Sequence, residues 1–205
     1  MKTLSTLASA AALVLCTPLH AADTPAYSIG DSGFYNIDSP VSVGFAFTAL
    51  QNVSITALGY HDNLLDGLLN AHDVGLYSSA GTLLASVNVA SGTFGDLVGE
   101  YRYASLNTAY DLVAGSAYVL AAHTTAGDGY RFAGTPSFDA AILIGPDAGG
   151  YSYGPSLMFP ATAGFGFYGT PNMLFAGTVP VPEPGTYALM LVGLGVLGWF
   201  ARRRA

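Results

Sequence analysis

A stretch rich in aspartate and asparagine, "DNLLDGLLNAHD", is the part of the sequence best suited to binding a metal ion. It fills positions 1, 5, 6, 9 and 12 of a calcium-loop template with Asp62, Asp66, Gly67, Asn70 and Asp73. Leu64 stands where the template needs a ligand at position 3, and the flanking patterns are strands, so an EF-hand is excluded. Two interpretations stay open: a calcium ion that fastens the loop, or a solvated loop whose Asp and Asn residues favour turns.

The histidines show no spacing typical of a metal or catalytic centre. His72 is either a metal ligand or a hydrogen-bonded strand residue, while His61 and His123 lack partners at H-x-H or H-E-x-x-H spacing. One G-x-S-x-G match occurs, GYSYG at Gly150–Gly154, but it lies in a stretch rich in Gly, Pro and Tyr with no helical pattern after it, so it lacks the strand–turn–helix context of a nucleophile elbow. Glu100 is the only glutamate before the C-terminal region, so any glycosidase-like carboxylate pair would depend on aspartates. We expect a protein that is not an enzyme.

Tyrosine is abundant, with thirteen copies, and two pairs are spaced for one face of a strand: Tyr101/Tyr103 and Tyr151/Tyr153. A flat, exposed aromatic face suits stacking on sugar rings. The same spacing also builds a sandwich core whose phenol hydroxyls reach water. Both interpretations remain open at this point.

Charge excludes one class of partner. Between residues 23 and 180 there are twelve acidic residues and two basic ones, Arg102 and Arg131, a formal charge of −10. Phosphate contacts need clustered lysine or arginine. We therefore expect no nucleic-acid binding.

The N-terminus has the layout of a secretory signal peptide at residues 1–22. Lys2 precedes an apolar run, and small residues follow, which predicts cleavage after Ala21 or Ala22. Cys16 is the only cysteine, and Leu15 before it does not suit a lipoprotein signal. The mature chain then has no cysteine, so its stability must come from core burial, with a bound metal as one further source.

The middle of the chain alternates apolar and polar residues in short runs bounded by Gly, Asn, Asp and Ser, and no window keeps a helical period with caps at both ends. The clearest strand patterns cover residues 42–49, 52–60, 72–77, 82–89, 100–106 and 117–123. Shorter patterns lie at 141–144, 157–159, 165–168 and 173–176. Together they predict an all-β chain, with a single jelly-roll-like β-sandwich at residues 23–176.

The C-terminus combines an apolar segment with a basic end. Residues 187–201 contain no charge and no proline, and as a helix they would extend ~22 Å, short of a ~30 Å hydrocarbon core. The arginines that follow favour the cytoplasmic side. Prolines before the segment should hold the 177–186 linker extended. We expect a marginal transmembrane helix at 187–205.

This tail resembles the PEP-CTERM sorting signal of Gram-negative bacteria. The resemblance is carried by three parts in order at the end of the chain: Pro182, Glu183 and Pro184, then the short apolar helix, then Arg202, Arg203 and Arg204. It implies an inner-membrane-tethered precursor, recognition by an exosortase, removal of the tail, and transfer to the cell surface or extracellular matrix. Such proteins commonly accompany exopolysaccharide and biofilm formation, and the resemblance implies no catalysis.

The middle also resembles β-sandwich domains that are often found in PEP-CTERM proteins. The shared features are an L-G-x-x-D opening, D-G-L, an H-x-V-G-L hairpin and a later A-G-x-x-Y-V strand, over about residues 40–125. The resemblance implies no particular activity. We expect an exported, non-enzymatic cell-surface or extracellular matrix protein; the alternatives are a carbohydrate-binding module for the surrounding polysaccharide and, less favoured by the residues, a secreted hydrolase.

Overall fold

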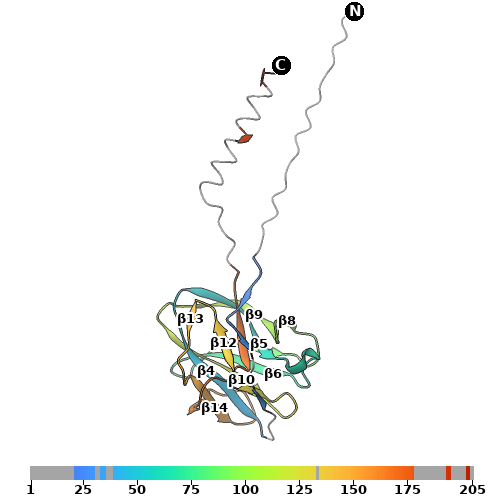
Figure 1. The fold of residues 1–205 in the computed structure, drawn as a ribbon. Helices are drawn as coiled ribbons and strands as arrows, with labels where there is room; N and C mark the ends of the chain where they lie inside the picture. The colour runs from blue at the N-terminus through green and yellow to red at the C-terminus, as the bar shows by residue number, and fades with distance from the viewer. Residues whose placement is uncertain are drawn as a thin grey trace, which may run out of the picture. The chain divides into compact units, whose positions relative to one another are not determined.

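The computed structural model describes residues 21–30, 33–35, 39–132, 134–177, 193–194 and 202–203. The chain divides into two units, Ala22–Gly177 and a second unit formed by Met1–Ala21 with Thr178–Ala205. The first unit holds the named strands and is described here (Figure 1).

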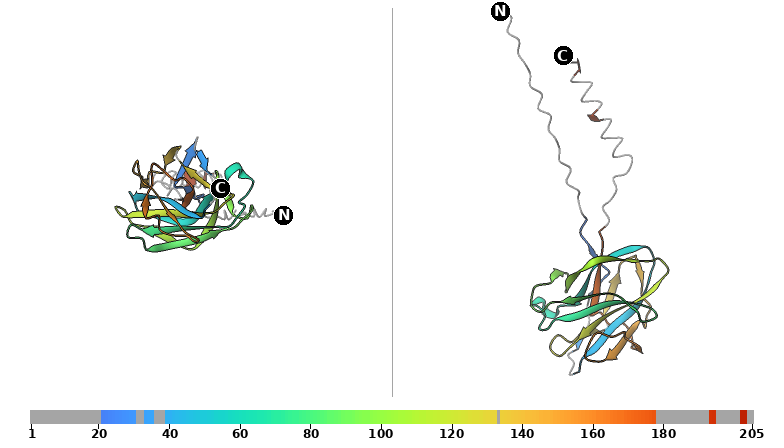
Figure 2. Two further views of the ribbon diagram at one scale, coloured as in Figure 1. Left: turned by 90° about the horizontal axis from the view of Figure 1, so that it is seen from below. Right: turned by 180° about the vertical axis from the view of Figure 1, so that it is seen from behind.

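Two antiparallel sheets face each other in this domain (Figures 1 and 2). The first sheet has the order β1 (Thr24–Pro25), β16 (Pro171–Phe175), β5 (Val53–His61), β9 (Tyr101–Leu112) and β8 (Asp96–Val98). The second has the order β15 (Thr162–Ala163), β14 (Gly149–Tyr153), β4 (Val41–Ala49), β10 (Ala117–Thr124), β6 (His72–Ser78) and β7 (Leu83–Val89), with β13 (Ile142–Leu143) also paired to β4. Two ribbons complete it: β11 (Tyr130–Phe132) with β3 (Gly33–Tyr35), and β12 (Thr135–Phe138) with β2 (Tyr27–Gly30).

Successive strands mostly change sheet. The chain crosses from β4 to β5, returns to the β6–β7 hairpin, crosses again to β8 and β9, and returns to β10. This alternation is the connectivity of a jelly-roll-like sandwich, and the predicted all-β fold is confirmed.

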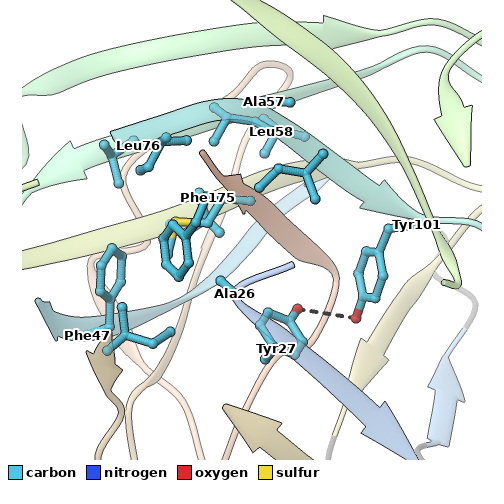
Figure 3. Packing of buried hydrophobic residues seen from close by; sticks show 14 of the residues in the cluster. Ala26, Tyr27, Phe47, Ala57, Leu58, Leu76, Tyr101 and Phe175 are labelled. Atoms are coloured by element: carbon cyan, nitrogen blue, oxygen red, sulfur yellow. Dashed lines mark hydrogen bonds between the residues drawn. The ribbon is translucent and has the colours of Figure 1, made fainter. Parts of the chain in front are cut away.

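The core lies between the sheets and is rich in aromatic side chains. Phe45 and Phe47 of β4 are buried on the face that points into this core, whereas Ala46 between them is exposed. Tyr27 and Tyr101 bring their hydroxyls within 3.2 Å of each other, as Figure 3 shows. Tyr103 is also buried, so the 101/103 pair builds the core.

Two predicted strands are wrong for identifiable reasons. Residues 157–159 form no strand, because Leu157 and Phe159 pack over Tyr77 on the outer face of the second sheet. Residues 165–168 form none either, because Gly166 has a positive φ of 67° and Phe167 turns into the core. The hairpin of β6 and β7 has the predicted turn, and β9 is longer than predicted.

The first and last strands of the sandwich are neighbours. Thr24 of β1 pairs with Phe175 of β16. Just outside this pair, Asp23 accepts hydrogen bonds from the backbone N–H of Gly177 (3.1 Å) and from the Thr56 hydroxyl (2.5 Å). Both ends of the domain are therefore held at the same place.

Candidate functional site

The first half of the 62–73 loop is anchored by an ion pair. The Asp62 carboxylate is buried and lies 2.7 Å from Arg102 Nε on β9. It also accepts the N–H of Gly67, 3.2 Å from each oxygen. Arg102 in turn donates to the carbonyls of Thr93 and Gly95. Asp62 is thus bonded to two protein donors, one of them charged.

The second half of the loop is held by a carboxylate that the sequence pattern did not single out. Asp128 accepts hydrogen bonds from the backbone N–H groups of Leu69 (2.8 Å) and Asn70 (2.7 Å), and lies 2.9 Å from His72 Nε2. Burial alone would raise the pKa of Asp128, but the hydrogen bonds from His72 and these two N–H groups lower it.

His72 is a hydrogen-bonded strand residue, the second of the two interpretations. Its Nδ1 lies 3.0 Å from the His123 carbonyl oxygen, and its ring stacks on Tyr60 with centroids 3.8 Å apart. Both ring nitrogens therefore face hydrogen-bond acceptors inside the domain. This imidazole fixes β6 to the loop that carries Asp128.

The candidate calcium ligands are not gathered into one coordination shell. Asp73 accepts a hydrogen bond from Asn88 Nδ2 at 2.8 Å, Asn70 is bonded to Asp128, and Asp66 is exposed at the end of the 3₁₀ turn η1 (Asn63–Leu65). Within the described residues, no group of three or more His, Cys, Asp and Glu side chains could hold a metal ion. Calcium binding stays a prediction. The contacts favour neither a shared coordination shell nor a fully solvated loop, because Asp62, Asn70 and Asp73 are bonded to other protein groups.

A second polar cluster lines a hollow of about 300 Å³ beside this loop. Arg131 Nη1 lies 2.7 Å from His61 Nε2 and forms an ion pair with Glu100. Burial lowers the pKa of His61 to about 3, with a further contribution from the Arg131 charge. His61 is therefore neutral at physiological pH and accepts the arginine's hydrogen bond.

The second tyrosine pair has a different environment from the first. Tyr151 and Tyr153 of β14 pair with Val43 and Val41 of β4, so these four side chains share one face. Together with Tyr130 and Tyr168 they line a hollow of about 190 Å³. We call these six residues the tyrosine hollow.

The hollow continues the inner face of the second sheet beyond the core. Phe45 and Phe47 of β4 belong to the main core cluster, whereas Val41 and Val43, on the same face, form the buried floor of the hollow. Tyr153 is the most accessible wall residue, with 68 % of its surface exposed. In Figure 1, β14 lies beside β4 at the lower end of the domain.

Ring contacts and close backbone approaches fix the walls. Tyr130 stacks on Tyr35 of the neighbouring β3 with centroids 5.6 Å apart. A Cβ atom at Gly149 would lie 2.7 Å from the Tyr168 ring, and one at Gly164 would lie 2.5 Å from it. Any other residue at these two positions would therefore collide with the ring where it now lies. The walls are therefore preorganised by local packing.

Comparison with protein families decides the identity of the domain. A family described as a domain of unknown function, DUF4082, matches residues 30–168, which is more than half of the chain. The chain belongs to the DUF4082 family. No curated protein matches it. The DUF4082 match extends beyond about residues 40–125, the range of the resemblance noted from the sequence, and it contains the whole tyrosine hollow.

The C-terminus of this DUF4082 protein matches the PEP-CTERM protein-sorting motif at residues 180–204. The motif marks an exported protein that an exosortase processes, as the sequence predicted. Pro182, Glu183, Pro184 and Arg204 lie outside the described residues, as do residues 1–20 of the predicted signal peptide. Among the residues that the structure describes, no helix is long and apolar enough to cross a membrane.

Sequence reasoning identified part of the tyrosine hollow and missed the rest. The spacing of Tyr151 and Tyr153 signalled a shared strand face. Tyr130 and Tyr168 come from other segments, and no local pattern connects them with β14. Asp128 was missed for the same reason, because its partners lie about 56 to 59 residues away in the chain.

Proposed function

We propose that this protein is a non-enzymatic component of the cell surface or extracellular matrix of a Gram-negative bacterium. After export by its signal peptide it is tethered briefly in the inner membrane, loses its tail to an exosortase, and remains associated with exopolysaccharide in a biofilm. The observation that carries the proposal is the PEP-CTERM match at residues 180–204, after a DUF4082 domain.

The contacts of the ionisable side chains support a non-catalytic role. Asp62 is bonded to Arg102, Asp128 to His72, and Glu100 to Arg131. Each of these groups fixes one part of the backbone to another. A general base or nucleophile needs a free proton-accepting atom directed at a substrate, and these paired groups instead serve the fold.

Mass spectrometry of the extracellular protein tests the proposal. We expect peptides up to the linker that contains Pro182, and no peptide that contains Trp199 or the terminal arginines. Glu183→Ala should leave the tail attached and keep the protein in the membrane fraction, whereas Asp96→Ala, at an exposed position within the domain, should leave processing unchanged. Recovery of Trp199 in protein from outside the cell would contradict the proposal.

A further inference from the structure

We propose that the tyrosine hollow binds a neutral pyranose ring of an extracellular polysaccharide. The inference deepens the proposed function. It rests on that function in one respect only, namely that polysaccharide surrounds the protein. It concerns a site within the domain that no part of the sorting process requires.

The shape and the lining of the hollow suit one sugar ring. Pyranoses present a face of C–H groups that packs on aromatic rings, and here tyrosine walls stand over an apolar floor of Val41 and Val43. The volume of about 190 Å³ is below the roughly 300–1,000 Å³ of pockets for drug-sized ligands. The hollow therefore fits a single unit of a chain whose neighbouring units remain in solvent.

The hydroxyl groups of the hollow are available to a ligand. Elsewhere in the domain, Tyr27, Tyr60 and Tyr101 donate to backbone carbonyls. Within the described part of the chain, the hydroxyls of the four wall tyrosines have no hydrogen-bond partner: Tyr130, Tyr151, Tyr153 and Tyr168. Four phenol groups around one hollow can donate to and accept from sugar hydroxyls, which have the same dual capacity.

Two of the wall phenols have a raised pKa. Burial and the neighbouring phenols Tyr153 and Tyr35 raise the pKa of Tyr130. Burial, together with the phenols of Tyr130, Tyr151 and Tyr153, raises the pKa of Tyr168. These two side chains therefore offer the ligand neutral hydroxyl groups.

Charge selects among polysaccharides. The mature domain carries a formal charge of −10 between residues 23 and 180, and its two arginines are both paired with carboxylates. A polyuronate would be repelled, and no lining residue of the hollow is basic. We therefore assign the site to neutral sugars.

Affinity electrophoresis of the exported protein, purified from the cells that make it, tests the inference. The gels contain one of three neutral glucans (dextran, laminarin or hydroxyethyl cellulose) or the polyuronate alginate. We expect retardation by at least one neutral glucan and none by alginate. Tyr153→Ala should weaken binding by about tenfold or more, as loss of an aromatic anchor does, while Tyr153→Phe, which keeps the ring, should retain most of it.

Phe94→Ala is the matched control, because Phe94 is 89 % exposed and is not part of the hollow. It should bind like the wild type. Absence of retardation by all three glucans, equal retardation by alginate, or unchanged binding in both Tyr151→Ala and Tyr153→Ala would each overturn the inference. A correctly processed extracellular protein that binds no glucan would overturn the inference and leave the proposed function standing. A protein that binds glucan but keeps its tail would contradict the proposed function and leave the inference standing.

Discussion

Replacing Arg102 by methionine should remove a large part of the stability of the domain. The side chains of Arg102 and Asp62 are 6 % and 0 % exposed, and the change leaves the carboxylate with Gly67 N–H as its only donor among the described residues. Breaking a buried ion pair on one side costs about 3–5 kcal/mol. Since whole domains are stable by only about 5–15 kcal/mol, we expect a loss of about 4 kcal/mol in the free energy of unfolding.

Urea unfolding of three variants measures this effect. Arg102→Met should lower the midpoint strongly. Asp62→Asn leaves the buried Arg102 guanidinium without a counter-ion and should lower it less only because Arg102 still donates to the carbonyls of Thr93 and Gly95. The double variant should recover part of the loss. The expected coupling between the two positions is about 2 kcal/mol or more. If the free energy of unfolding of Arg102→Met lay within about 1 kcal/mol of the wild-type value, the buried ion pair would be refuted. Asp62 would then be a free carboxylate and again a candidate calcium ligand.

Three further predictions concern packing, pH and calcium. A Cβ atom at Gly44 would lie 2.0 Å from the Leu120 carbonyl oxygen, so Gly44→Ala should cost about 3 kcal/mol or more in thermal unfolding, whereas Gly145→Ala, with nothing within 4 Å, should be neutral. The pKa of Asp128 is lowered from 3.8 in the folded protein, so the ionised carboxylate stabilises the fold. The free energy of unfolding of the wild type should therefore exceed that of Asp128→Asn by its full amount above pH 3.8, and the excess should disappear as the pH falls through the folded-state pKa. An excess that grows in acid would contradict this. Because Asp62 and Asp73 have protein partners and only Asp66 is exposed, melting curves in millimolar Ca²⁺ and in chelator should coincide; a rise in Tm that vanishes in Asp66→Ala would instead establish a calcium site.

The sequence was most informative where one strand face is buried. Alternation in β4 and β5 predicted both strands, because every second side chain must enter the core. The same rule failed at residues 157–159, where apolar side chains cover the outside of a sheet from a loop. Hydrophobic spacing reports burial, and it does not say whether a ladder of backbone hydrogen bonds accompanies it.

The site was less predictable because its partners are distant in the chain. The carboxylate spacing at 62–73 matched a metal template, but the side chains that bond to Asp62 and Asp128, Arg102 and His72, come from β9 and β6. The tyrosine hollow likewise needs β14, β11 and the loop before β16 together. Only the packing of the two sheets determines which of several equivalent carboxylates and tyrosines meet.

The position of the domain ends explains how a sandwich can accept removal of its tail. β16 is a buried strand between β1 and β5, and its last residue, Phe175, is in the core. Gly177 is held by Asp23, which follows directly after the predicted signal-peptide cleavage sites. Among the described residues, the hydrophobic core uses none beyond Phe175, so the predicted loss of the tail beyond Gly177 would remove no described core side chain. The pairing of β1 with β16, together with the Asp23–Gly177 hydrogen bond, holds the two ends of the described domain next to each other without any contribution from the tail.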